Sequence, residues 1–462
     1  MGGEEMTPLN LRELLSDWEA RGLLYKVKKE VNAKYELGAV VKTKKGEQPF
    51  LFEKVKGYNV PMVAGLGGSR TLMADSIGAD ESELIPRMIH ALVRPIPTNL
   101  VSHGPVHENV VMGPFDLDDF FPVPTFHAED CGPYYVSGVL VVKDPEGEKR
   151  YTSIRRMGFI GGNRTNITIT SPELGRQFAQ CEERGEALEV AVMFGVIPAI
   201  VLTSQFSTHL YHADKLDAAG GLLGQALDVV PCKTVDLEVL AEAEIVMEGK
   251  IIPHERDDEG TFAELGGTYG GNMPQPIVEM SAITYRNNPI SQTILPASSE
   301  EKLPMCLVRE MVLLSTVRQT VPNIKAVHVT LAAAARLHAI IQIDKKSDAD
   351  AKQAALAAFA SDKDLKHVVV VNEDVDIFDP EDVEWAIATR CQADQDIFIV
   401  PGAKGSPLES SHNLRGTSAK MGIDATYPLS EKEAYRRAYI PVDKINLEDY
   451  LQDFDSDGRE TR

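Results

Sequence analysis

The spacing of apolar residues divides the chain into three parts with different periodicities. In the first part, Leu11, Leu14, Leu15 and Trp18 form an apolar stripe behind the capping residue Asn10, which predicts a helix. A second helix is predicted over 82–93, and strand-like runs lie at 24–31, 49–55 and 60–64. We expect a small N-terminal α/β unit over residues 1–105, because a proline-rich segment follows it.

From residue 134 the pattern becomes strand-like. Runs at 136–143 and 150–157 flank a turn and predict a hairpin, with helices predicted over 172–184 and 214–223. Other strands are predicted at 166–170, 188–194, 197–203, 233–239, 244–252 and 277–285. So many strands with so few helices favour a split-barrel-like β domain, placed at residues 106–300, over a doubly wound sheet.

A long apolar-periodic segment predicts a linking helix over residues 301–322, and a C-terminal α/β domain is expected over 323–462. The strands expected there are 326–330, 337–345, 367–372 and 397–400, with helices over 348–359 and 380–389. A last amphipathic helix is predicted over 446–454, and it packs either on its own chain or on a second subunit. The expected fold class is therefore mixed, α+β with an α/β C-terminal domain.

Composition narrows the possible functions. The 462 residues carry 47 Lys and Arg against 69 Asp and Glu, a formal charge of −22, which argues against binding nucleic acid or an anionic membrane. Five cysteines without a CxxC pair fit a reducing cytoplasm and no structural zinc. No apolar run has the length of a membrane span, and neither a GxGxxG nor a P-loop motif occurs.

The acidic, glycine-rich segment 257–269 (DDEGTFAELGGTY) is the strongest candidate for chemistry. Its glycines predict a tight loop that fixes Glu259 and Glu264 relative to each other. If the two carboxylates share a pocket, burial and mutual repulsion raise the pKa of at least one and make it a proton donor. A solvated acidic loop is the alternative.

Four further segments carry a family resemblance when read in order with E-G-x-x-x-E. They are residues 151–164 (YTSIRRMGFIGGNR), 219–224 (AGGLLG), 232–249 (CKTVDLEVLAEAEIVMEG) and 419–426 (AKMGIDAT). In this order the chain resembles the UbiD-type decarboxylases, which use prenylated FMN, from about residue 10 to about residue 440.

The resemblance implies a catalytic trio of Arg156, Glu259 and Glu264. Glu264 would protonate the substrate carbon after CO2 leaves, while Arg156 and Glu259 orient and tune it. The prenyl-derived ring of the cofactor would form a covalent adduct with the substrate and accept the electron pair. A buried arginine can bind one carboxylate through two hydrogen bonds and keep it ionised, while a second carboxyl group beside that negative charge can hold its proton.

The same resemblance implies where the cofactor lies. The residues expected to line it are Ser153, Ile154, Arg155, Arg156, Thr168, Ile169, Thr170 and Glu173. The family anchors the flavin phosphate through Mn2+, with K+ nearby, but the two ligand positions hold Tyr151 and Lys215 here. Because a phenol and an ammonium are poor ligands for a hard cation, we expect Lys215 to pair with the phosphate directly. A one-residue slip in the match, which would make Asp214 or Asp217 a ligand, is the alternative.

Substrate and partners follow only as hypotheses. Arg286, in the polar segment 285–292, is expected to bind a second carboxylate, which favours 2,5-furandicarboxylate and then pyrrole-2-carboxylate. Other aromatic or acrylic acids, an FMN-dependent flavin reductase and a non-catalytic carboxylase subunit are the alternatives. The resemblance also implies CO2 as product or co-substrate, a flavin prenyltransferase as cofactor supplier, and a homodimer or a ring of dimers.

Overall fold

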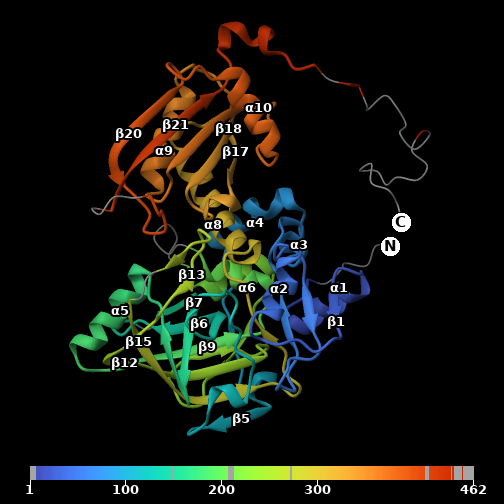
Figure 1. Cartoon of the computed structure of the whole chain (residues 1–462), viewed down its shortest axis with the longest axis vertical. Helices are drawn as coiled ribbons and strands as arrows, with labels where there is room; N and C mark the ends of the chain where they lie inside the picture. The colour runs from blue at the N-terminus through green and yellow to red at the C-terminus, as the bar shows by residue number, and fades with distance from the viewer. Residues whose placement is uncertain are drawn as a thin grey trace.

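The computed structural model describes residues 7–147, 149–206, 213–270, 273–411, 416–438, 440–441 and 450. Three layers of the chain are visible in Figure 1, where the N-terminal unit and the barrel lie below and the C-terminal domain lies above, with α8 (Ser299–Val317) between them. Among the described helices, even the 19-residue α8 lacks the apolar length that a bilayer crossing requires.

The N-terminal unit packs four helices around a four-stranded sheet of order β1-β2-β3-β16. The Asn10 side chain caps α1 by accepting from the Glu13 amide at 3.0 Å, and the predicted apolar stripe is buried. Two short helices, α2 and α3, were missed by the pattern. The helices are α1 (Leu11–Ala20), α2 (Glu36–Lys42), α3 (Arg70–Asp75) and α4 (Leu84–Val93), and the strands are β1 (Tyr25–Val27), β2 (Phe50–Phe52), β3 (Met62–Ala64) and β16 (Ser291–Gln292).

The predicted barrel is confirmed as a closed antiparallel barrel of six strands in the order β12-β9-β6-β7-β8-β15. Pairing of β12 with β15 closes it, and β5 (Asn109–Met112) extends it beyond β15. Apolar side chains such as Leu140, Val192 and Val278 fill its core. Its strands are β6 (Tyr134–Lys143), β7 (Arg150–Gly161), β8 (Arg164–Ile167), β9 (Leu188–Phe194), β12 (Ile245–Asp258) and β15 (Pro274–Tyr285).

Three expectations about the elements near the barrel were wrong. Residues 197–203 form a helix, α6 (Pro198–Ser204), and not a strand. All residues of α6 are buried, and a short run of this kind has too few polar positions for their spacing to distinguish a helix from a strand. Only the end of 233–239 is a strand. The acidic segment is not wholly irregular, because it includes the paired strands β13 (Phe262–Ala263) and β14 (Tyr269–Gly270). The remaining elements are α5 (Pro172–Glu183), α7 (Lys215–Leu223) and the sheet of β4 (Asn99–Leu100), β10 (Asp228–Pro231) and β11 (Glu238–Leu240).

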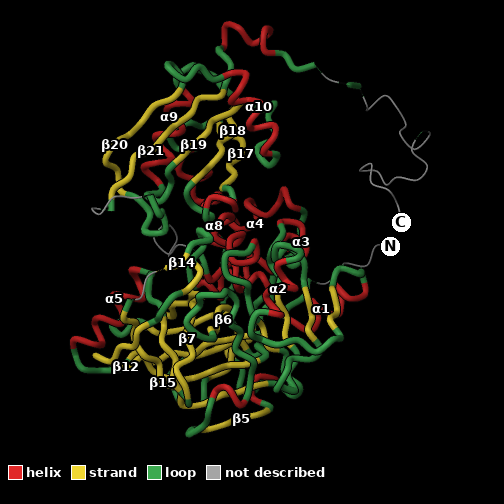
Figure 2. The backbone as a smooth tube through the Cα atoms, viewed as in Figure 1, coloured by secondary structure: helices red, strands yellow, loops and turns green. Residues whose placement is uncertain are grey.

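The C-terminal domain contains a five-stranded sheet of order β17-β18-β19-β21-β20. Figure 2 shows these strands side by side, with helices packed on them. The sequence pattern missed β21 and started α8 two residues late. The elements are β17 (Ile324–Val329), β18 (His338–Ile343), α9 (Asp350–Ser361), β19 (His367–Asn372), α10 (Pro380–Arg390), β20 (Ile397–Lys404) and β21 (Thr417–Ala425). The helix predicted over 446–454 lies outside the described residues apart from position 450, and the domain boundaries at 105, 300 and 322 stay a prediction.

Candidate active site

Three charged side chains, distant in sequence, meet at the end of the barrel that faces the C-terminal domain. Arg156 lies on β7, Glu259 directly follows β12, and Glu264 directly follows β13. The Arg156 Nε donates to Glu259 Oε1 at 2.5 Å, and its Nη2 donates to Glu264 Oε1 at 2.9 Å. Figure 1 shows β13 just below the C-terminal domain, and a Cβ built on Gly266 would lie 3.6 Å from the carbonyl oxygen of Leu408. The turn that carries Glu264 therefore lies next to the C-terminal domain, although residues 266–269 are exposed.

The two carboxylates have different surroundings. Glu259 is 3% exposed, and its Oε1 accepts from both Arg156 and the Thr168 hydroxyl. The Tyr134 hydroxyl also donates to the Glu259 carbonyl oxygen at 2.7 Å, which fixes the backbone there. Glu264, by contrast, has a side chain 22% exposed and accepts from Arg156 alone among these groups. Glu259 is thus the buried carboxylate with two donors, and Glu264 is the carboxylate that solvent can reach.

An aromatic residue that the sequence pattern did not single out supports the arginine. The Phe262 ring lies 4.3 Å from the Arg156 guanidinium carbon and 4.7 Å, edge to face, from the Tyr134 ring. Burial lowers the pKa of Arg156, but its hydrogen bonds with Glu259 and Glu264 raise it by more, so the guanidinium stays charged. The position of Phe262 between the two glutamates was the only sequence signal for it.

A third acidic group, Glu301 on α8, lies close enough to Arg156 and Glu264 for their charges to act on it, and the sequence pattern did not single it out. Burial raises the pKa of Glu301, the Ala297 amide and the charge of Arg156 oppose that rise, and the charge of Glu264 adds to it. Its Oε2 accepts from the Ala297 amide at 2.6 Å. Because α8 is the linking helix, Glu301 brings a third segment of the chain to the site.

The residues expected to line the cofactor follow one edge of β7 and the segment after β8. Ser153 Oγ and Arg155 Nε are buried and have no hydrogen-bond partner among the described residues. Ile154 and Ile169 pack against the two apolar clusters of the barrel, while Thr170 is exposed. Unsatisfied buried polar atoms are costly, so this edge suits a polar ligand.

The remaining cofactor candidates lie at the start of α5 and of α7. Lys215 is 7% exposed, donates to the Ser204 carbonyl oxygen at 2.9 Å, and lies 4.7 Å from the centre of the Tyr151 ring. Burial and the charge of Arg155 lower the pKa of Lys215 to about 7, while Glu173 and Asp214 oppose this. A cavity of about 810 Å³ beside these residues is lined by Tyr151, Glu173 and Asp214 among others.

Arg286 is placed away from the trio. Tyr285 pairs with Ile245, at the opposite end of β12 from Asp258, and Arg286 follows it. The Arg286 Nη1 pairs with Glu242 at 2.9 Å and with Glu244 at 3.7 Å. These two carboxylates already compensate its charge. That Arg286 binds a second carboxylate of the substrate stays a prediction, which this geometry does not support.

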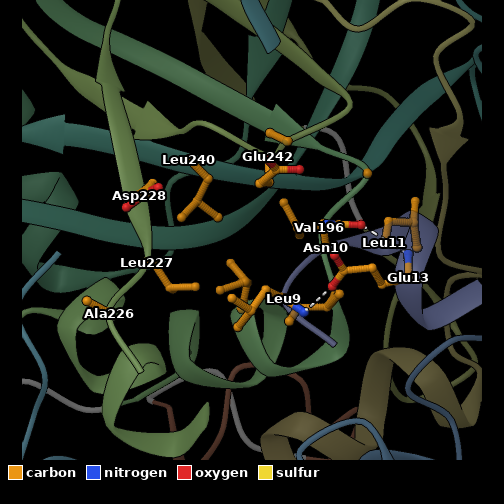
Figure 3. A pocket seen from close by; sticks show the side chains of 14 residues that line it. Leu9, Asn10, Leu11, Glu13, Val196, Ala226, Leu227, Asp228, Leu240 and Glu242 are labelled. Carbon is orange, nitrogen blue, oxygen red and sulfur yellow. Dashed lines mark hydrogen bonds between the residues drawn. The ribbon is translucent and has the colours of Figure 1, made fainter. Parts of the chain in front are cut away.

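A second cavity lies beneath the start of α1, and Figure 3 shows Leu9, Leu227 and Leu240 projecting into it with Glu242 at its edge. Its volume is about 180 Å³, and none of the trio lines it. We assign it no role in the chemistry.

The fold and the site together define a multidomain barrel protein with an Arg–Glu–Glu cluster next to a polar ligand edge. Three family models match in succession: the N-terminal domain of 3-octaprenyl-4-hydroxybenzoate carboxy-lyase over residues 15–92, its Rift-related domain over 99–299 and its C-terminal domain over 302–425. The chain belongs to the UbiD family of carboxy-lyases. The resemblance noted from the motifs is thus confirmed, and the flavin reductase alternative is set aside.

Curated relatives match over nearly their whole length. The chain is 35% identical to an anhydromevalonate phosphate decarboxylase of Methanothermobacter thermautotrophicus, over 89% of this chain and 96% of the relative. It is 30% identical to the gallate decarboxylase of Lactiplantibacillus plantarum, over 90% and 91%. These relatives are decarboxylases, so the chain is a carboxy-lyase.

Solved structures agree with the fold. The UbiD-class enzyme HmfF from Pelotomaculum thermopropionicum, in complex with FMN, is 46% identical and covers 96% of this chain and 100% of its own, with a TM-score of 0.93. An evolved dimeric form of HmfF, in complex with prenylated FMN, is 44% identical with a TM-score of 0.89.

Proposed function

We propose that the chain removes a carboxyl group from a heteroaromatic acid, without oxidation and reversibly, using prenylated FMN. The observation that carries the proposal is the single guanidinium of Arg156 holding Glu259 and Glu264 beside a buried edge of unpaired polar atoms. The two HmfF structures, one in complex with FMN and one in complex with prenylated FMN, support this choice of cofactor.

The residues present fit the cofactor. Ser153 and Arg155 would hold polar atoms of the flavin, Ile154 and Ile169 would contact its ring, and Lys215 would meet its phosphate. When bound, prenylated FMN supplies the sink for the electron pair that departing CO2 leaves on the substrate.

The chain's own residues then deliver the proton. The C–COO bond breaks, CO2 leaves with the carboxyl carbon, and the electron pair stays with the substrate carbon. Glu264 gives its proton to that carbon and becomes a carboxylate, which solvent reprotonates because the side chain is partly exposed. Arg156 holds Glu264 in place throughout, and Glu259, with Thr168, holds Arg156.

A divalent metal does not fit the residues at the phosphate end. No group of three or more His, Cys, Asp or Glu side chains that could hold a metal occurs within the described ranges. Asp214 pairs with Arg150 at 2.9 Å, and Asp217 lies 3.5 Å from the same guanidinium. We propose that the Lys215 ammonium takes the place of Mn2+, and we assign no K+ site. One tightly bound Mn2+ per chain in elemental analysis of the holoprotein would contradict this.

The first candidate substrate is 2,5-furandicarboxylate and the second is pyrrole-2-carboxylate. An acrylic acid that carries a phosphate is a third, because a 35%-identical relative is named anhydromevalonate phosphate decarboxylase. The proposed partners are CO2 and a flavin prenyltransferase, and the proposed assembly is a homodimer or a ring of dimers.

Glu264→Gln tests the mechanism in protein co-expressed with a flavin prenyltransferase. We expect CO2 release from the preferred acid to fall by about 10²- to 10⁴-fold, the usual contribution of a positioned general acid. Flavin content should stay unchanged, and Glu279→Gln, on the exposed face of β15, is the matched control. Unchanged turnover in Glu264→Gln would refute the donor role, and turnover of cinnamate-type acids with none of furan or pyrrole acids would refute the substrate class.

A further inference from the structure

One arginine near the active site is buried without a close anionic partner. Arg336 directly precedes Leu337 and β18, and its side chain is 15% exposed. Its Nε meets the Ala334 carbonyl oxygen at 3.4 Å, its Nη2 meets the Met305 sulfur at 3.5 Å, and its Nη1 lies 3.6 Å from Asp364. The two contacts to oxygen are long, and a thioether is a weak acceptor. The hydrogen-bonding capacity of this guanidinium is therefore largely unused among the described residues.

Three other arginines around this site have close carboxylate partners. Arg309 donates to both Asp362 and Asp364, Arg156 to the two glutamates of the trio, and Arg70 to both oxygens of Glu310. Asp364 in turn already pairs with Arg309 at 2.8 Å and with Lys363 at 2.6 Å. Arg336 is thus the most distant of the three cations around Asp364, whose charge the two closer cations already neutralise.

The backbone before Arg336 is held in an unusual conformation. Ala334 and Ala335, both buried, have φ values of 54° and 58°. Two consecutive non-glycine residues in the left-handed region cost energy and persist only where packing enforces them. This turn follows a 3-10 helix, η4 (Leu331–Ala333), and aims the Arg336 side chain at α8.

The face of α8 that Arg336 meets leads to the catalytic trio. Met305 lies one helical turn after Glu301, so the two share a face. Glu301 is close enough to Arg156 and Glu264, and also to Arg336, for these charges to act on one another. Arg336 and two members of the trio, Arg156 and Glu264, are therefore all electrostatic neighbours of Glu301 on α8.

We propose that Arg336 binds a second anionic group of the substrate, a carboxylate or a phosphate monoester. A guanidinium fork binds either group through two parallel hydrogen bonds. Burial raises the pKa of Glu301, the acidic neighbour of Arg336 on α8. The inference rests on the proposed function, because it names the recognition element of that site.

Ligand binding to enzyme loaded with unmodified FMN separates this inference from turnover. The probes are 2,5-furandicarboxylate against 2-furoate, and anhydromevalonate phosphate against its dephosphorylated form, followed by flavin difference absorbance and calorimetry. For Arg336→Met we expect the two-anion ligand to bind about 10- to 100-fold more weakly, as for a lost charge-assisted hydrogen-bond pair, with the one-anion ligand unchanged. The pair of probes that shows the effect identifies the anion as carboxylate or phosphate.

Two further variants keep the result interpretable. Arg286→Met removes a comparably buried arginine whose partners are Glu242 and Glu244, and it should leave both ligands unchanged. Arg336→Lys keeps the charge and should restore part of the preference for two-anion over one-anion ligands. If Arg336→Met does not retain FMN, the same affinities are measured on Arg336→Lys. Equal effects on one-anion and two-anion ligands, or no effect on either, overturn the inference. Absence of CO2 release from any acid by wild-type enzyme carrying prenylated FMN refutes the proposed function instead.

Discussion

The buried carboxyl of Glu300 allows a quantitative test of how the N-terminal unit is fastened to α8. Its two oxygens accept from the amides of Gly65 and Leu66, each at 2.7 Å. Burial raises the pKa of Glu300 from 4.5 to about 7, and the amides of Gly65, Leu66 and Gly67 oppose the rise. At about 1.36 kcal/mol per pKa unit, this difference corresponds to roughly 3 kcal/mol.

The sign follows from proton linkage. The pKa of Glu300 is higher in the folded than in the unfolded chain, so the folded state binds the proton more tightly. The stabilisation is fully present below about pH 4.5, decreases as the pH rises, and is lost above about pH 7. About 2 kcal/mol of it lies between roughly pH 5.5 and pH 8.

Glu300→Gln removes this titration and keeps the side-chain shape. We expect the stability of the wild type relative to Glu300→Gln to fall by about 2 kcal/mol between roughly pH 5.5 and pH 8. Urea denaturation at the two pH values measures the difference, and hydrogen exchange of the amides of residues 65–67 reports it locally. The exposed Glu53, changed to Gln, is the control. A stability difference between wild type and variant that is the same at both pH values would refute the reasoning.

Two other predictions concern the cofactor and the barrel. Because the pKa of Lys215 is about 7 and a phosphate favours the charged ammonium, FMN affinity should fall by up to about tenfold per pH unit above pH 7. Lys215→Met should bind FMN more weakly and lose this pH dependence. A pH dependence of FMN affinity that is unchanged in the variant, measured by fluorescence titration, would contradict the role of Lys215. Gly249→Ala should destabilise the barrel by about 1–3 kcal/mol, because its Cβ would lie 2.3 Å from the Glu279 carbonyl oxygen in β15; a melting temperature equal to that of the wild type would show that the strands adjust freely.

Motif order was enough to nominate Arg156, Glu259 and Glu264, which the structure brings together. Each of the three lies in a segment whose structure the local sequence pattern predicts, either a hairpin strand or a glycine-rich turn. The period-2 pattern likewise predicted β6, β7 and β9 and hence the barrel.

Residues that reach the site from other domains could not be predicted in this way. Glu301 lies in an ordinary helix and Arg336 follows a run of alanines, and only tertiary packing brings Glu301 near Arg156 and Arg336 onto Met305 of α8. The ion pair of Arg286 was likewise not legible, because its partner Glu242 comes from another segment. Ion pairing across domains is a tertiary property, and no local pattern records it.

The short strand β16 has a consequence for how the chain is made. It completes the N-terminal sheet by pairing with β3, although more than two hundred residues separate the two strands in sequence. On the ribosome, which adds residues in order, the first unit emerges with an open sheet edge beside β3. That edge stays uncovered until the barrel has been synthesised, so the N-terminal unit can reach its final form only after the segment that carries Glu259 and Glu264 has also left the ribosome.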